Sequence, residues 1–293
     1  MLRTAVTRAA IPGTTFAAKA VLLGEYTPEM PPALRIRMTT AFTPITQYSC
    51  APFMAASTDG HNISHDVYRR GSGAPVVIIQ ELPGIGPETL RLADEFVARG
   101  FEVILPHLFG PLGKVRTGGN LLRVFCMRKE FSLFAENHTS PIVDWLKALC
   151  REIKTERDTK GVGVIGMCLT GNFAISLMGD DSVLAAVSSQ PSMPLMKSYD
   201  LHMSAQDIRN IRKHIDDTAP MHTYRFSGDR LCNAAKFEAI DKAFNNDGVT
   251  RVATHTLPGK GHSVLTLDFV DESGHPTREA LNNILDYFSQ QLL

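Results

Sequence analysis

Hydrophobic and polar positions become regularly patterned at about Ala51, and the pattern predicts alternating strands and helices. The run 74–80, with the sequence APVVIIQ, is apolar up to its last residue, which is typical of a strand buried on both faces. Residues 62–69 alternate between apolar and polar side chains, as in a strand buried on one face. An amphipathic helix is expected over 87–99, where Gly100 follows the last turn.

The rest of the chain repeats this alternation. Further strands are expected at 101–105, 161–165, 184–188, 221–226 and 251–257, and further helices at 140–153, 169–178, 204–214, 234–244 and 277–292. Strands separated by helices of this length predict an α/β fold, with a mostly parallel sheet and helices on both of its faces.

The first 50 residues have a different character. They show no sustained periodicity and contain five prolines, so we expect a poorly structured leader at 1–50 and one domain at 51–293. Residues 1–23 carry three basic and no acidic side chains, which is similar to a weak transit peptide. A disordered extension, or an upstream start codon with the working start at Met38, explains the same composition.

Composition limits the partners that the domain can have. The chain has 293 residues, 44% of them hydrophobic and 20% charged, so it can bury a large core. Thirty basic side chains balance thirty acidic ones, which does not favour a surface for nucleic acid or for an anionic membrane. No apolar run approaches the roughly 18 residues of a transmembrane helix. We therefore expect small-molecule chemistry, with no nucleic-acid or membrane partner.

The cysteines and histidines show no metal-site pattern. Five cysteines are present, an odd number, and none of them has the spacing of a zinc site. This usage favours reduced thiols in a cytoplasmic enzyme over a disulfide framework. His61 and His65 are four residues apart, but the strand pattern separates them in space, so no metal is expected there.

The most informative stretch is 161–171, with the sequence GVGVIGMCLTG. It predicts a buried strand, a sharp turn at Cys168 and then a helix, which is the nucleophile elbow of an α/β-hydrolase fold with cysteine in place of serine. Gly166 leaves room for the crossing helix, and Thr170 occupies the usual second small position next to Gly171. The helix directs its N-terminus at Cys168 and favours the thiolate.

This stretch has two other interpretations. Cys168 as a buried apolar cysteine is the commonest fate of that residue type, but the strand–turn–helix context favours catalysis. Gly161, Gly163 and Gly166 also match a dinucleotide-binding pattern, with Asp181 at the expected distance. That pattern requires glycines between a strand and a helix, whereas here a polar segment precedes them and they lie within the strand itself.

A nucleophile needs a base, and the base needs an acid that orients it. In this fold the chain order is nucleophile, acid, histidine. His262 lies in a glycine-flanked loop after a late strand, and Asp229 follows the end of the preceding strand. The weaker rival for the base is His275. A turn or helix-capping aspartate is the alternative for Asp229.

The end of the first buried strand adds a further group. Glu81 follows this strand at the carboxyl edge of the sheet, facing the elbow. The backbone N–H of Leu82 is expected to join that of Leu169 as an oxyanion hole. A solvated loop glutamate is the alternative for Glu81.

Four motifs together resemble the dienelactone hydrolase family: QELPGIG at Glu81, GMCLTGNFA at Cys168, FSGDRL at Asp229 and GKGHSV at His262. The resemblance covers about residues 55–290. It implies a single α/β-hydrolase domain with a Cys-Asp-His triad and no cofactor. Cys168 would attack the ester carbonyl, His262 would shuttle the proton and Asp229 would orient the ring. The resemblance further implies that Glu81 contacts the resting thiol and helps to activate it.

Members that act on dienelactones bind the substrate carboxylate with arginines, one of them a few residues beyond the histidine. The run 262–266 contains no arginine. Cations are instead concentrated in 110–134, where a cap over the site is expected, and the preferred candidates are Arg128 and Arg230. The sequence thus predicts a hydrolase of a small ester or lactone that works through an acyl-enzyme thioester. An acyltransferase or thioesterase with the same triad, and a non-catalytic binding relative, are the alternatives.

Overall fold

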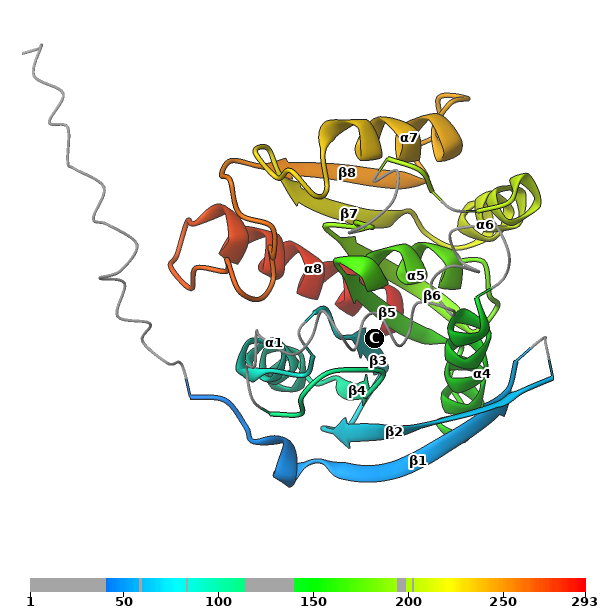
Figure 1. The fold of residues 1–293 in the computed structure, drawn as a ribbon, viewed down its shortest axis with the longest axis vertical. Helices are drawn as coiled ribbons and strands as arrows, with labels where there is room; N and C mark the ends of the chain where they lie inside the picture. The colour runs from blue at the N-terminus through cyan, green and yellow to red at the C-terminus, as the bar shows by residue number, and fades with distance from the viewer. Residues whose placement is uncertain (1–40, 58–59, 83, 114–139, 194–198, 202) are drawn as a thin grey trace, which may run out of the picture. The chain divides into compact units, whose positions relative to one another are not determined.

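The computed structural model describes residues 41–57, 60–82, 84–113, 140–193, 199–201 and 203–293. Within these residues, eight strands form one sheet in the order β1-β2-β4-β3-β5-β6-β7-β8 (Figure 1). The strands are β1 (Ser49–Ala56), β2 (Asn62–Arg70), β3 (Pro75–Ile79), β4 (Glu102–Pro106), β5 (Val162–Met167), β6 (Val183–Ser189), β7 (Met221–Phe226) and β8 (Val252–Leu257). Strand β2 pairs antiparallel with β1 and with β4, and every pair from β4 to β8 is parallel. The expected α/β-hydrolase fold with a mostly parallel sheet is confirmed.

Helices cover both faces of the sheet, as Figure 1 shows. They are α1 (Pro87–Ala98), α4 (Pro141–Glu156), α5 (Leu169–Leu177), α6 (Ala205–Asp217), α7 (Ala234–Phe244) and α8 (Pro276–Leu292). One buried apolar cluster contains side chains of α1 and α8, and the other contains side chains of α4, α5, α6 and α7. Strand β3 contributes Val76 and Ile78 to the first cluster and Val77 and Ile79 to the second. Because successive side chains of a strand face opposite sides, an apolar run is buried on both faces here.

The ordered domain begins earlier than the boundary expected at residue 51. Strand β1 starts at Ser49, after the short 3₁₀ turn η2 (Ile45–Gln47). Tyr48 is buried, and Phe42 and Ile45 pack against the cluster that contains α1 and α8. Residues 1–40 lie outside the described residues, so the poorly structured leader stays a prediction.

The parallel register brings five strand ends to one edge of the sheet. Ile79 pairs with Gly166, Met167 with Ser189, Ser189 with Tyr224, and Phe226 with Leu257. In an open α/β sheet, ligands bind outside the carboxyl ends of the strands. The loops that follow β3, β5, β6, β7 and β8 therefore share the edge where a site is expected.

Candidate active site

Cys168 occupies a strained turn between β5 and α5. Its backbone has φ 57° and ψ −122°, a left-handed φ that side-chain-bearing residues rarely adopt and that is often found at functional sites. Gly166 makes this turn possible, because a Cβ there would lie 2.1 Å from the Thr170 carbonyl oxygen. The side chain of Cys168 is buried at the N-terminus of α5. The predicted strand–turn–helix geometry is present.

Thr170 links the elbow to the neighbouring strand end. Its Oγ1 accepts the Met167 N–H at 2.9 Å and lies 3.0 Å from the Ile79 carbonyl oxygen and 3.1 Å from that of Gln80. The side chain is completely buried. A threonine at the second small position of the elbow therefore fixes the loop that follows β3 against the turn.

His262 and Asp229 meet as the chain order predicts. The His262 Nδ1 lies 2.7 Å from the Asp229 Oδ2, and the Asp229 Oδ1 accepts the N–H groups of Leu231 and Cys232 at 2.8 and 3.1 Å. Backbone N–H groups thus fix the carboxylate through Oδ1, and the carboxylate orients the His262 ring through Oδ2. This is the arrangement by which an acid fixes the orientation of a catalytic imidazole.

The ring of His262 lies beside the side chain of Cys168. Burial opposes protonation of the ring, but hydrogen bonding and charge interactions with Asp229 and Cys168 outweigh burial and raise the pKa of His262 to about 10. Nε2 is buried and has no hydrogen-bond partner of normal geometry among the described residues, although the interaction with Cys168 places the two side chains next to each other. A free Nε2 beside a thiol is placed to exchange a proton with it.

The loop that carries His262 is held by its backbone. The Asp268 Oδ2 accepts the N–H of His262 at 2.8 Å and that of Ser263 at 2.9 Å. A Cβ on Gly261 would come within 2.7–2.9 Å of the Asp268 side chain. Glycine is therefore needed here for the close approach of a carboxylate.

Glu81 lies at the predicted edge, but its contacts differ from those that the family resemblance implies. Its Oε2 accepts the Gln190 Nε2 at 3.1 Å and the Ser263 Oγ at 3.0 Å, and its Oε1 bonds to the Thr266 hydroxyl. Burial raises the pKa of the Glu81 carboxyl above its ordinary value, and these hydrogen bonds oppose the rise. Since Ser263 and Thr266 follow His262 in the chain, Glu81 contacts the histidine segment instead of the thiol.

The hydrogen-bond partner of the thiol is a residue that sequence reasoning missed. The Ser192 Oγ lies 3.3 Å from the Cys168 Sγ, and Ser192 is buried. Ser192 follows β6, the neighbour of β5 in the sheet. No sequence motif marks it, because its contact with the thiol depends on β6 lying next to β5, which places the residues after β6 beside the elbow.

The expected oxyanion hole is consistent with the geometry of two loops. Leu169 is the first residue of α5, where helix N–H groups lack an intrahelical acceptor. Leu82 follows β3, which pairs with β5. Neither N–H donates to another described residue. The pairing of these two groups around one substrate oxygen stays a prediction.

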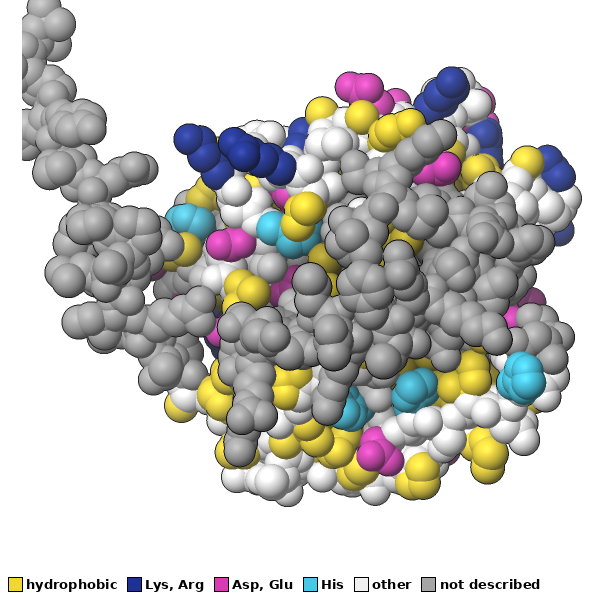
Figure 2. All heavy atoms as spheres, viewed as in Figure 1, with side chains coloured by type: hydrophobic (Ala, Val, Ile, Leu, Met, Phe, Trp, Pro, Cys, Tyr) yellow, Lys and Arg dark blue, Asp and Glu magenta, His cyan; other side chains and the backbone are white. Residues whose placement is uncertain are grey.

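The structure describes only one of the two arginines that were candidates for binding a substrate carboxylate. Arg128 lies outside the described residues. Arg230 is exposed and follows Asp229 directly. A Cβ on Gly228 would come within 2.9 Å of the Lys260 side chain, so the loops after β7 and β8 lie against each other. Figure 2 shows a group of Lys and Arg side chains where these two strands end.

Other residues considered from the sequence lie apart from this site. The His275 side chain accepts the Thr277 N–H and caps α8, so this rival for the base has a structural contact. In the described part of the chain, no three His, Cys, Asp or Glu side chains form a group that could hold a metal ion. No helix among the same residues has the length and apolar character needed to cross a membrane.

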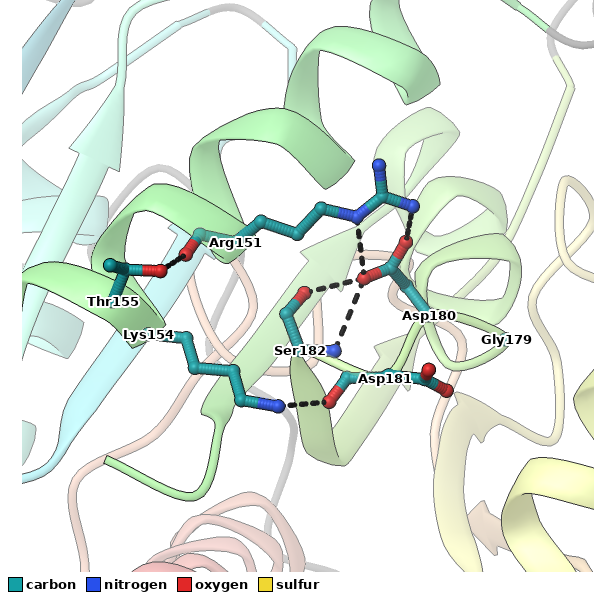
Figure 3. Close-up of a pocket in the computed structure, with 7 residues that line it drawn as sticks. All are labelled: Arg151, Lys154, Thr155, Gly179, Asp180, Asp181 and Ser182. Carbon is teal, nitrogen blue, oxygen red and sulfur yellow. Dashed lines mark hydrogen bonds and ion pairs between the residues drawn. The ribbon is translucent and has the colours of Figure 1, made fainter. Parts of the chain in front are cut away.

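A shallow pocket of about 370 Å³ lies elsewhere, at the turn between α5 and β6 (Figure 3). Arg151 pairs with Asp180, and the Lys154 Nζ donates to the Asp181 carbonyl oxygen at 2.9 Å. Cys168 precedes the first turn of α5, whereas this pocket follows its last turn. The lining of the pocket has paired charges and contains neither cysteine nor histidine, so it is not the candidate active site.

Comparisons with known proteins agree with this geometry. Residues 67–292 match the model of a family described as the dienelactone hydrolase family. No curated protein matches the sequence.

Solved structures similar in fold include a putative dienelactone hydrolase from Klebsiella pneumoniae, with 15% identity and a TM-score of 0.56 over 83% of this chain and 99% of that one. A dienelactone hydrolase-like promiscuous phosphotriesterase from metagenomic libraries has 16% identity and a TM-score of 0.58, over 84% and 100% of the two chains. An esterase from Pyrococcus furiosus has 14% identity and a TM-score of 0.53, over 86% and 96%.

Proposed function

This chain belongs to the dienelactone hydrolase family, a family of carboxylic ester hydrolases, and we propose that it cleaves a small ester or lactone with Cys168 as its nucleophile. The observation that carries the proposal is the contact of 2.7 Å between the His262 Nδ1 and the Asp229 Oδ2, with the ring beside Cys168 at the same sheet edge. Nucleophile, base and orienting acid are the three roles that acyl transfer requires.

The reaction divides into two steps. The Cys168 thiolate attacks the ester carbonyl, the C–O bond to the leaving alkoxide breaks, and the His262 Nε2 gives that alkoxide a proton. The product of this step is a thioester on Cys168. His262 then takes a proton from water, the hydroxide attacks the thioester, and the S–C bond breaks to release the acid and restore the thiolate.

Backbone N–H groups are proposed to stabilise the oxyanion that forms in both steps. Leu169 and Leu82 are the candidates, because one begins the elbow helix and the other follows the paired strand. Such donors act on charge that develops only in the transition state. Glu81 belongs to the same proposal as a group that holds the histidine segment in place.

The charge near the proposed site favours an anionic substrate. Arg230 and Lys260 follow β7 and β8, and no ion pair joins either one to another described residue. A guanidinium at the rim is placed to attract a substrate carboxylate. We include Arg128 as a second candidate from the sequence alone.

The described cysteines are unpaired, which supports the proposed cytoplasmic location.

The test is a panel of lactones and short-chain p-nitrophenyl esters, with wild type and Cys168→Ala compared at equal concentrations. We expect Cys168→Ala to lose at least about 1,000-fold in kcat/KM, the scale seen when a triad nucleophile is removed. Cys50→Ala is the matched control, because Cys50 is exposed on β1, and it should keep wild-type turnover. Adding an alcohol acceptor distinguishes a transferase, whose product would be a new ester. Full activity in Cys168→Ala would rule out the proposed nucleophile.

A further inference from the structure

Ser192 is fixed next to the nucleophile by its backbone. Its N–H donates to the Cys168 carbonyl oxygen at 3.1 Å, and its own carbonyl oxygen accepts the Asn172 Nδ2 at 3.1 Å. Gln190, two residues earlier, has φ 37° and donates its N–H to the Tyr224 carbonyl oxygen. The loop after β6 is therefore held against the elbow from both sides, and the position of the Ser192 hydroxyl is set by these contacts.

Within the described residues, the Ser192 hydroxyl has one neighbour that can accept its proton. Among the described residues, the hydrogen-bond contact of the Ser192 Oγ is with the Cys168 Sγ, at 3.3 Å. Ser192 is only 1% exposed, so bulk water is not available as a substitute. A buried hydroxyl without an acceptor is unfavourable, and a thiolate is a far better acceptor than a thiol. The contact is consequently strongest when Cys168 is ionised.

We propose that Ser192 is a further catalytic residue, whose hydroxyl donates a hydrogen bond to the Cys168 Sγ and stabilises the thiolate. The inference rests on the proposed function. It assigns Ser192 to both half-reactions: the hydroxyl stabilises the attacking thiolate before the thioester forms, and it stabilises the departing sulfur when the S–C bond breaks. No proton leaves the serine in either step.

The other polar groups nearby do not fill this role. Glu81 is occupied by Gln190, Ser263 and Thr266. The His262 Nε2 has no hydrogen-bond partner of normal geometry in the part of the chain that the structure describes, which leaves it available for proton transfer. A hydroxyl that stabilises the sulfur without taking its proton thus complements a histidine that moves protons.

The test measures alkylation of Cys168 by iodoacetamide as a function of pH. Trypsin cuts after Lys160 and Lys197, and the peptide 161–197 contains Cys168 as its one cysteine, so mass spectrometry follows this site separately from the other cysteines. In Ser192→Ala we expect the pH of half-maximal alkylation to rise by about one unit, with about tenfold slower alkylation at neutral pH. Ser192→Thr keeps the hydroxyl and should restore the wild-type profile.

Ser188→Ala is the matched control. Ser188 is a buried serine of β6 whose Oγ donates to the Gly171 carbonyl oxygen at 2.8 Å, so its loss removes a hydroxyl near the elbow that does not touch the sulfur. Its alkylation profile should stay that of wild type. Ser192→Gly removes the same hydroxyl and replaces Ser192→Ala if that variant does not fold.

The results of this experiment distinguish the proposed function of the protein from the proposed role of Ser192. Labelling of Cys168 in wild type with activity retained would overturn the proposed function, independently of Ser192. Labelling that abolishes activity, together with an unshifted profile in Ser192→Ala, would overturn the role of Ser192 and leave the function intact. A profile that shifts equally in Ser192→Thr and Ser192→Ala would show that packing, and not the hydroxyl, causes the change.

Discussion

Replacing Thr170 with valine tests how the elbow is joined to the loop after β3. Valine has nearly the same shape as threonine, so the change removes one hydroxyl without opening a cavity. The Met167 N–H loses its acceptor at 2.9 Å, and the one hydroxyl proton is no longer available to the carbonyl oxygens of Ile79 and Gln80, which lie 3.0–3.1 Å away. Because the Thr170 side chain is completely buried, water cannot replace the lost hydroxyl as a hydrogen-bond partner.

The size of the effect follows from the buried polar groups. Leaving a buried donor or acceptor unsatisfied costs about 1–3 kcal/mol, and we expect a loss of about 2 kcal/mol in the free energy of unfolding. For a domain of this size, 1 kcal/mol lowers Tm by roughly 2–4 °C, so Thr170→Val should melt about 4–8 °C below wild type. Thr170→Ser keeps the hydroxyl and loses one methyl group, which is worth about 0.8 kcal/mol.

The activity of Thr170→Val should fall for a reason separate from its loss of stability. The backbone from Ile79 leads directly to Glu81 and Leu82, and Leu82 carries one of the two proposed oxyanion donors. Without the Thr170 link this loop is free to move relative to Leu169. Loss of one oxyanion donor costs about 100- to 1,000-fold in kcat, and partial misplacement should cost about tenfold.

Thermal melting by circular dichroism and steady-state hydrolysis of p-nitrophenyl acetate measure the two effects on the same preparations. We expect Thr170→Val to lose both stability and kcat, while Thr170→Ser keeps most of both. A valine variant that melts within 1 °C of wild type with unchanged kcat would show that this hydroxyl does not link the two loops.

Two further predictions concern charge. Because burial raises the pKa of the Glu81 carboxyl, the folded protein holds this proton at pH values where the unfolded chain has lost it, so the contribution of Glu81 to stability falls as pH rises above the ordinary carboxyl range. Melting between pH 5 and 8 should therefore show a smaller decline in Glu81→Gln than in wild type, and parallel curves would contradict a raised pKa for Glu81. Arg230→Met should raise KM about two- to fivefold for p-nitrophenyl hemisuccinate and leave its methyl ester unaffected. Arg209→Met, at an exposed arginine of α6, is the control, and equal changes with both substrates would exclude an anion contact.

The buried parallel strands were predictable because their environment is uniform along their length. The strand expected at 221–226 and the helix expected at 234–244 have the same bounds in the structure. Strand β1 (Ser49–Ala56) was not predicted, because it is a largely exposed edge strand that contains Pro52. Proline is tolerated at an edge, where its missing N–H disrupts no ladder, but in a sequence it argues against a strand.

The candidate site was predictable to the extent that it depends on strand ends. Cys168, Asp229 and His262 each follow a predicted strand, and parallel strands end at one edge. Ser192 and Gln190 could not be placed in the same way, because their roles depend on β6 lying next to β5 and on a left-handed φ at Gln190. Side-chain contacts across loops require the tertiary arrangement that the sequence pattern does not contain.

The two carboxyl groups of the site have environments that assign them different tasks. Asp229 accepts two backbone N–H groups and the His262 ring, so these contacts fix the carboxylate and the ring together. Glu81 is buried among hydroxyls and an amide, and burial raises its pKa. Asp229 is thus suited to stabilise a protonated His262, whereas Glu81 holds the segment that carries the ring through its bonds to Ser263 and Thr266.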